Sequence, residues 1–210
     1  QPDLNWENPK VRQEVFNIMK FWADKGVDGF RLDAFQFVSK DTEFPPFPKG
    51  YDDNIPSVIK YHGMGPHIHS YLREMYNEVL SKYDVFAVSE GAGSTLDDAH
   101  SIVDEDRNEL QMVYHFEGTD LVSSLDKCSL KDFKESFTKW ETSFQKKGWI
   151  SMYLSNHDQS RVVNRFGNDD PKFKDYSAKM LNTFILSMRG TPYVYYGDEL
   201  GMTDIGFTKI

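Results

Sequence analysis

The stretch GFRLDAF, residues 29–35, decides the fold that this sequence predicts, because it places Asp33 directly after a short apolar run. The same arrangement recurs in VFAVSEG, which contains Glu90, and in YLSNHDQSR, which contains Asp158. Apolar runs of this length that are bounded by loops are typical of buried strands in a parallel sheet. We therefore expect Asp33, Glu90 and Asp158 to lie at one rim of the sheet, where α/β proteins carry their chemistry.

Apolar residues at helical spacing separate the strand-like runs. Asn8 followed by Pro9 is a helix-start signal, and Gly26 ends the periodic run that follows. Strands that alternate with helices in this way favour a parallel α/β architecture. The expected strands are 27–33, 85–90, 110–116, 150–154 and 191–196, and the expected helices begin at Asn8, His67, Ser129 and Tyr176.

Four blocks resemble, in chain order, the signatures of glycoside hydrolase family thirteen, the α-amylase superfamily. They are QPDLNW at residues 1–6, GFRLDAF, the glutamate of VFAVSE, and SNHDQSR at residues 155–161. The QPDLN form is similar to the oligo-1,6-glucosidase and α-glucosidase group. The resemblance implies that residues 1–210 form a partial (β/α)8 barrel of about strands four to eight, and that 1–7 is the tail of a loop domain inserted after the third strand.

The resemblance also implies a role for each polar residue at the rim. Asp33 would be the nucleophile, Glu90 the general acid/base and Asp158 the stabiliser of the sugar hydroxyls, while Arg31, His157 and Arg161 would bind the substrate. Two carboxylates that flank a scissile bond are what retaining glycoside hydrolysis needs. The implied reaction releases glucose from the non-reducing end of α-glucosides such as maltose or isomaltose, through a covalent glycosyl-enzyme, and needs no metal or redox cofactor.

We expect the chain to be an internal piece of a longer enzyme and to be inactive by itself. The family's earlier motif, Asp-x-x-x-x-Asn-His, has no counterpart here, and 210 residues fall short of the roughly 250 of a complete barrel. In the strand 27–33, alternation places Arg31 and Asp33 on the face that would line the barrel interior, where Arg31 can stabilise the charge of Asp33. Residues 39–66, rich in Pro, Gly and Asp, are expected to form a long loop at the substrate entrance.

Composition narrows the class of partner. The chain has 24 basic and 33 acidic residues, a net charge of −9, which disfavours nucleic acid or an anionic membrane and leaves a small neutral oligosaccharide as the expected partner. No apolar run approaches the ~18 residues of a membrane span. The single cysteine, Cys128, excludes an internal disulfide and suits a reducing compartment, so we expect a cytoplasmic protein.

Three other interpretations concern individual motifs. The GAGST that follows Glu90 is similar to a phosphate-binding loop, but Leu96 stands where the third glycine of a dinucleotide fingerprint belongs. His67 and His69 are two residues apart and so point to different sides of a helix, which favours packing over metal binding. The acidic pairs 52–53 and 97–98 are interpreted as loop and helix-start charges rather than calcium ligands.

Two functional alternatives stay open. A transglucosylase or an isomerase of the same family, such as a sucrose isomerase or trehalose synthase, shares every named residue. A non-enzymatic relative, such as the heavy chain of an amino-acid transporter, uses the barrel as a scaffold and tends to lose triad carboxylates. All three are present in this sequence.

Overall fold

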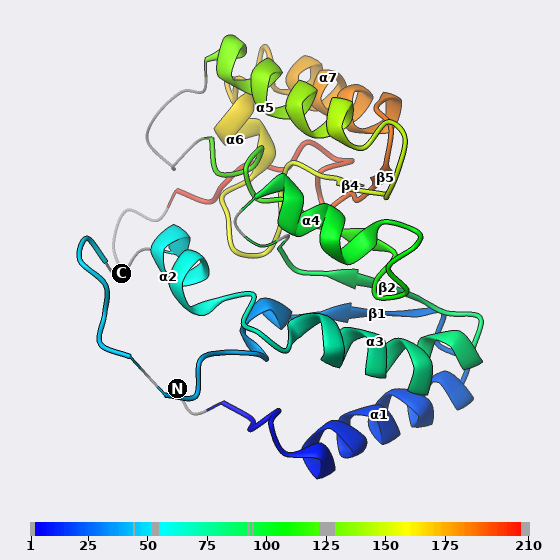
Figure 1. The fold of residues 1–210 in the computed structure, drawn as a ribbon. Helices are drawn as coiled ribbons and strands as arrows, with labels where there is room; N and C mark the ends of the chain where they lie inside the picture. Colours follow the sequence, from blue (N-terminus) through cyan, green and yellow to red (C-terminus); the bar gives the residue numbers. More distant parts are fainter. Residues whose placement is uncertain are drawn as a thin grey trace. The chain divides into compact units, whose positions relative to one another are not determined.

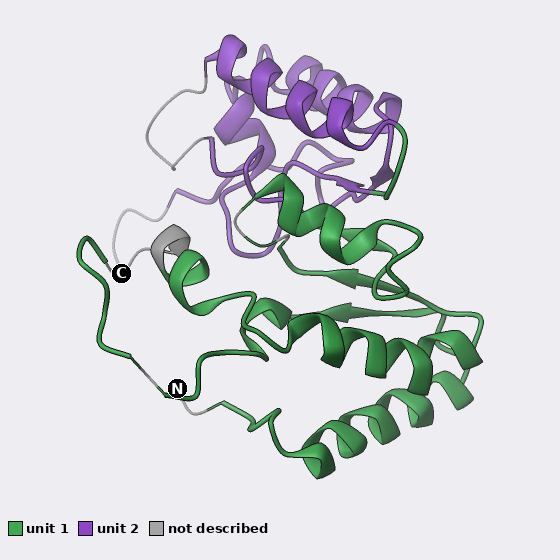
Figure 2. Cartoon of the chain, in the orientation of Figure 1, with its two compact units in different colours: residues 1–114, 146–149 green, residues 115–145, 150–210 purple. Residues whose placement is uncertain are grey.

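The computed structural model describes residues 3–43, 45–51, 55–91, 93, 95–121 and 129–206. The chain divides into two compact units, which are Gln1–Tyr114 with Lys146–Trp149 and His115–Gln145 with Ile150–Ile210 (Figure 2). Each unit contains parallel strands and the helices that connect them. The predictions made for residues 52–53 and for Cys128 lie outside the described residues.

The first unit is built on a three-stranded parallel sheet with the order β1-β2-β3 (Figure 1). Its elements are α1 (Pro9–Asp24), β1 (Gly29–Leu32), the 3-10 helix η1 (Phe35–Phe37), α2 (Ile55–His62), α3 (Ile68–Glu78), the 3-10 helix η2 (Leu80–Lys82), β2 (Phe86–Ser89), α4 (Leu96–Val103) and β3 (Met112–Val113). The register pairs Leu32 of β1 with Ser89 of β2. Asp33 and Glu90, the residues that follow these two, are therefore neighbours across adjacent strands.

Helix α1 begins as the sequence predicts and packs beside α3 (Figure 1). The Asn8 side chain accepts a hydrogen bond from the Lys10 N–H at 3.0 Å, which satisfies a main-chain donor of the first turn. Arg12 Nε lies 2.6 Å from Glu74 Oε2, so an ion pair joins the two helices. The Arg12 guanidinium also lies 4.7 Å from the centre of the Tyr71 ring.

The residues of β1 pack closely against their neighbours. Phe30 and Leu32 line a cavity together with Met75 of α3, and Arg31 and Asp33 also contribute to its wall. Gly29 is required by close packing, because a Cβ at this position would lie 2.5 Å from the Phe86 carbonyl oxygen. This close approach brings β1 and β2 together at the end of the sheet opposite Asp33.

A buried carboxylate fixes α3 to the segment before β3. The Glu109 side chain is fully buried and lies 2.8 Å from both His69 Nδ1 and Arg73 Nη1, with Arg107 Nη2 at 3.4 Å. His67 instead has its ring 5.9 Å from that of Tyr71. The two histidines thus make separate packing contacts, and no group of three or more metal-ligand side chains occurs within the described part of the chain.

The second unit contains the parallel pair of β4 (Ser151–Met152) and β5 (Thr191–Pro192) with α5 (Leu130–Ser143), α6 (Val162–Phe166) and α7 (Lys174–Ser187). Helix α5 begins at the predicted cap, where Ser129 Oγ accepts a hydrogen bond from the Asp132 N–H at 3.1 Å. His115 is 2% exposed, and its ring stacks on Trp140 with 4.4 Å between ring centres. Burial lowers the pKa of His115 to about 4, so it is a neutral core residue near neutral pH.

Several predicted elements need correction. The expected loop 39–66 contains α2, because the proline in its sequence IPSVIKYH occupies the first turn, where a helix needs no N–H donor. Of α4 only the start, at residues 97–98, was predicted, and α6 was not predicted. The strands are shorter than their apolar runs, and 110–116 contributes only β3, because residues beyond the paired ladder leave the sheet. None of the described helices is both long enough and apolar enough to cross a membrane.

Candidate active site

One arginine joins two carboxylates at the ends of β1 and β2. Arg31 Nη1 lies 2.7 Å from Asp33 Oδ1, and Arg31 Nη2 lies 2.8 Å from Glu90 Oε1. A guanidinium offers such a fork of donors, which fixes the relative position of two acceptors. The side chain of Asp33 is 74% exposed and that of Glu90 is 19% exposed. The sequence predicted the support of Asp33 by Arg31, and the structure adds the bond to Glu90.

The main chain of Ala34 completes the cluster. Ala34 has φ 45° and ψ 30°, a left-handed conformation that non-glycine residues rarely adopt. This turn directs its N–H to Glu90 Oε2 at 3.0 Å. The Glu90 N–H donates in turn to the Leu32 carbonyl oxygen at 2.8 Å. The end of β1 therefore holds both the main chain and the side chain of Glu90.

The surroundings of Glu90 favour its protonated form. Burial raises the pKa of the Glu90 carboxyl, and a hydrogen bond and the negative charge of Asp33 act in the same direction. The Ala34 N–H and the positive charge of Arg31 oppose this rise in pKa without cancelling it. A carboxyl with a raised pKa beside a second, exposed carboxyl is an arrangement suited to a general acid and a nucleophile.

A large cavity opens beside Asp33 and Ala34 in the first unit. Its volume is about 1110 Å³, and Trp6, Phe47 and Tyr61 are among the aromatic residues that line it. Aromatic rings such as those of Trp6 and Tyr61 can stack on the faces of sugars. Their position in the same cavity as Asp33 places apolar ring surface within reach of a ligand bound there.

The remaining predicted residues lie in the second unit, after β4. His157 and Asp158 are both exposed, and His157 Nε2 lies 3.5 Å from Asp158 Oδ2. The Asp158 N–H donates to Asn156 Oδ1 at 2.9 Å, which shapes a tight polar turn. Arg161 Nη1 donates to the Tyr196 carbonyl oxygen at 2.5 Å, so its guanidinium also connects this turn to the segment after β5. The structure thus groups Arg31 with Asp33 and Glu90 in the first unit, and in the second unit it pairs His157 with Asp158, while Arg161 contacts the segment after β5.

Comparison with known proteins identifies the family to which the chain belongs. Over residues 1–209 the chain matches the family described as "Alpha amylase, catalytic domain". The chain belongs to the α-amylase family. It is 49% identical to the oligo-1,6-glucosidase of Parageobacillus thermoglucosidasius and 48% identical to that of Bacillus cereus. Both alignments cover all of this chain but 38% of the relative, so the chain spans a little over a third of the length of these curated relatives.

Solved structures agree with this membership. An isomaltulose synthase from Klebsiella sp. LX3 matches with a TM-score of 0.91 and 38% identity, over 100% of this chain and 38% of that one. A trehalose-6-phosphate hydrolase from Bacillus licheniformis matches with a TM-score of 0.84 and 39% identity, over 96% of this chain and 36% of that one. The α-amylase family match and these neighbours indicate a (β/α)8 barrel, of which the chain fits a part.

A network of polar groups around the buried Arg165 supports the turn that carries Asp158 in this α-amylase family member. Arg165, which is 6% exposed, donates to Gln159 Oε1 at 2.5 Å and to the carbonyl oxygen of Thr119. Gln159 Nε2 donates to Asp120 Oδ1 at 3.1 Å. The sequence did not predict these supports, because the contacts with Thr119 and Asp120 join segments about 40 residues apart and carry no local pattern.

The GAGST segment after Glu90 has a structural role at α4. Thr95 Oγ1 accepts a hydrogen bond from the Asp98 N–H at 3.1 Å, and Asp98 Oδ2 accepts one from the Thr95 N–H at 2.9 Å. This reciprocal capping box satisfies donors at the helix start that a phosphate would otherwise bind. It confirms the interpretation of Asp97 and Asp98 as helix-start charges.

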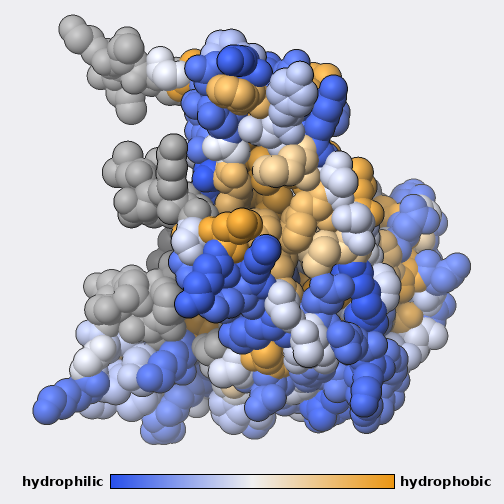
Figure 3. All heavy atoms as spheres, turned by 90° about the horizontal axis from the view of Figure 1, so that it is seen from above, coloured by the Kyte–Doolittle hydropathy of each residue, from blue (hydrophilic) through white to orange (hydrophobic). Residues whose placement is uncertain are grey.

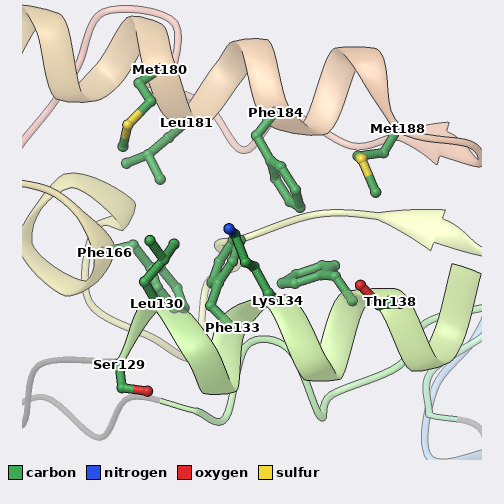
Figure 4. Close-up of a pocket in the computed structure, with 11 residues that line it drawn as sticks. Ser129, Leu130, Phe133, Lys134, Thr138, Phe166, Met180, Leu181, Phe184 and Met188 are labelled. Atoms are coloured by element: carbon green, nitrogen blue, oxygen red, sulfur yellow. The ribbon is translucent and has the colours of Figure 1, made fainter.

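A second cavity, of about 540 Å³, lies between α5 and α7 in the second unit (Figure 4). Phe133 and Phe184 face it with their ring centres 5.0 Å apart, and Met180 and Lys134 stand at its border. None of its lining residues is acidic, so this cavity lacks the groups for glycoside chemistry. On the molecular surface, hydrophobic residues gather in one area of the face seen from above, bordered by hydrophilic ones (Figure 3).

Proposed function

We propose that the protein to which this chain belongs is a retaining glycoside hydrolase that releases glucose from the non-reducing end of α-glucosides. Asp33 acts as the nucleophile and Glu90 as the general acid/base. Asp158 stabilises the sugar hydroxyls in the transition state, and Arg31, His157 and Arg161 bind the substrate. The substrates are small oligosaccharides of the maltose or isomaltose type.

The observation that carries this proposal is the coupling of Asp33 and Glu90 through Arg31. Arg31 Nη1 lies 2.7 Å from Asp33 Oδ1 and Arg31 Nη2 lies 2.8 Å from Glu90 Oε1, so one guanidinium holds the two carboxyls close together. Retaining enzymes hold their carboxyls at about 5–5.5 Å, whereas inverting enzymes leave about 6.5–9.5 Å for a water molecule. The close pair therefore supports retention.

The two steps of the reaction follow from the two environments. The exposed Asp33 carboxylate attacks the anomeric carbon while Glu90 transfers its proton to the departing glycosidic oxygen, so one C–O bond forms as another breaks. The ionised Glu90 then removes a proton from water, and that water displaces Asp33 and releases glucose. Arg31 balances the charge on both carboxylates throughout the cycle.

The same proposal covers the position of the chain in the barrel. Residues 1–7 are the tail of a loop domain after the third strand, and β1 to β5 are about strands four to eight. A cytoplasmic location is part of the proposal and is supported by a single cysteine in 210 residues. The sequence identity to oligo-1,6-glucosidases supports the choice of α-glucosides.

A second candidate is transglucosylation or sucrose isomerisation. It is favoured by the TM-scores of 0.91 and 0.92 to isomaltulose synthases from Klebsiella sp. LX3 and Erwinia rhapontici NX5. In this reaction an acceptor sugar, or the fructose just released, takes the place of water in the second step.

Product analysis of the complete protein separates the candidates. We expect purified enzyme to release glucose from maltose or isomaltose, with the α-anomer formed first, as followed by proton NMR. First formation of the β-anomer would show inversion and contradict the assignment of Asp33. Isomerised disaccharides from sucrose, or transfer products that dominate when an acceptor sugar is added, would favour the second candidate.

A further inference from the structure

We propose that Phe47, Tyr51, Tyr61 and His62 form an aromatic platform that binds the aglycone sugars of an oligosaccharide, the rings beyond the bond that is cleaved. The platform belongs to the loop and helix that follow β1, which bring it to the cavity beside Asp33. This inference rests on the proposed function. It names the part of the substrate that the cavity beside Asp33 recognises.

The cavity has the position and size for such a ligand. Asp33 and Ala34 form one part of its wall, and Phe47, Tyr61 and His62 form another. Its volume of about 1110 Å³ is just above the roughly 300–1,000 Å³ of pockets for drug-sized ligands. A chain of two or three sugar rings can therefore extend from the nucleophile along this wall.

Ring contacts hold the platform together. The rings of Phe47 and Tyr51 are stacked, with 4.4 Å between centres and 6° between planes. His62 meets both rings edge-on, at 5.7 Å from Phe47 and 5.5 Å from Tyr51. Tyr61 extends the group, with its ring 6.1 Å from that of Tyr51. Such offset and edge-to-face pairs are favourable, so the platform is formed before a ligand binds.

The platform is available to solvent and chemically suited to sugars. Phe47 is 67% exposed although its ring is stacked on that of Tyr51, so much of its surface is accessible to a ligand. Tyr61 is 37% exposed. Lys40 and Asp41 line the same cavity and supply a donor and an acceptor. A sugar ring presents an apolar C–H face with hydroxyls around its edge, which matches aromatic surface beside charged groups.

The test compares Phe47→Ala with Phe21→Ala in the complete enzyme. Phe21 lies in α1, is 54% exposed, and does not line the cavity, so its truncation is a matched control. We expect Phe47→Ala to lower kcat/KM for maltotriose or isomaltotriose about tenfold, the effect of losing one ring contact of about 1.4 kcal/mol. We expect no more than about a twofold change for α-glucosyl fluoride, because this substrate has no aglycone sugar to contact the ring.

Substitution by another aromatic residue and a binding measurement complete the design. Phe47→Tyr keeps the ring and should restore trisaccharide hydrolysis. In an Asp33→Asn background, calorimetry should show maltotriose binding that Phe47→Ala weakens about tenfold and Phe21→Ala leaves unchanged. The platform proposal would be overturned if Phe47→Ala changed the hydrolysis of both substrates equally, or if it changed neither hydrolysis nor binding. Platform-dependent binding without hydrolysis by the unmodified enzyme would overturn the proposed function instead.

Discussion

The Ala34 N–H donates a hydrogen bond to Glu90 Oε2 at 3.0 Å, so the residue after the proposed nucleophile holds the proposed acid/base. Arg31, two residues before the nucleophile, binds the other oxygen of Glu90 at 2.8 Å. Four consecutive residues, 31–34, thus carry one carboxylate and position the second. The chemistry of this site therefore depends on the local geometry of one strand end, and substitutions there test it directly.

Asp33→Asn should abolish turnover in the complete enzyme while it leaves the fold intact. The amide cannot act as a nucleophile, and the loss of this step should cost at least ~4 kcal/mol of transition-state stabilisation, or ~1000-fold in kcat. Asp28→Asn, at the opposite end of the same strand, is the control and should keep normal activity. A variant at Asp33 that retains a tenth of the rate would contradict its role.

Glu90→Gln should separate the two steps of the reaction. Hydrolysis of disaccharides should nearly stop, whereas α-glucosyl fluoride, whose leaving group needs no proton, should still form the glycosyl-enzyme. Added azide should then yield α-glucosyl azide, because an anionic nucleophile needs no general base. Absence of this rescue by azide, measured by product NMR, would argue against the acid/base role.

The pH profile should report the protonation of Glu90. The proton that this acid transfers is present below its pKa and is lost as the pH rises through it, so the raised pKa extends activity to higher pH. Because the charge of Arg31 lowers this pKa, Arg31→Met should move the basic limb of kcat/KM upward. Arg31→Lys keeps the charge and should leave that limb nearly in place while kcat falls, since a lysine cannot bridge both carboxylates. A downward shift in Arg31→Met would contradict this account.

Ala34 should influence linkage preference. The family resemblance implies that enzymes restricted to α-1,6 bonds carry valine after the nucleophile, so Ala34 implies maltose-type α-1,4 cleavage here. A difference of this size between two side chains changes the transition-state free energies of competing substrates, relative to each other, by ~1–3 kcal/mol. We expect a higher kcat/KM for maltose than for isomaltose, and a ratio that Ala34→Val shifts toward isomaltose. Because φ is 45°, the β-branched valine should also strain the turn and lower kcat for both substrates. A tenfold preference of the unmodified enzyme for isomaltose would show that the argument is wrong.

His115 should make stability depend on pH. Its pKa is about 4 in the folded protein and 6.5 in the reference state, so the unfolded chain binds more protons between these values. The contribution of His115 to the free energy of unfolding is therefore complete above pH 6.5, and it falls by about 3 kcal/mol in total as the pH is lowered toward 4. Urea unfolding of His115→Phe, which keeps a ring to stack on Trp140, should show a correspondingly weaker dependence between these pH values. An unchanged slope would exclude His115 as its source.

Local signals predicted much of the first unit. The Asn8 and Pro9 signal marks the start of α1, and the apolar run before Asp33 contains β1, both of which the structure confirms. Arg31 was placed correctly beside Asp33 because residues two apart share a face of a strand. The contacts that Arg31 and the Ala34 N–H make with Glu90 depend on the register between β1 and β2. Periodicity does not specify this register.

Composition misled the prediction where polar or turn-forming residues occur in helices. The proline in α2 made the sequence of this helix resemble that of a loop. The glycines around residue 92 resemble a phosphate-binding loop, which obscured the Thr95 cap of α4. Helix α6, with five residues, is too short to show periodicity. The support that Arg165 and Gln159 give to the turn of Asp158 also escaped prediction, because it depends on contacts with Thr119 and Asp120 in a distant segment.

The pairing of Leu32 with Ser89 makes the site sensitive to shifts along the strand. One residue inserted within β2 would turn every following side chain to the opposite face, and the Glu90 carboxyl would move away from Arg31. The same insertion in the loop around residue 50 would leave this pairing untouched, since loops accept added length at little energetic cost. Natural variation in chain length should therefore concentrate in that loop, where it can alter the choice of substrate, and should be excluded from the few residues of each strand.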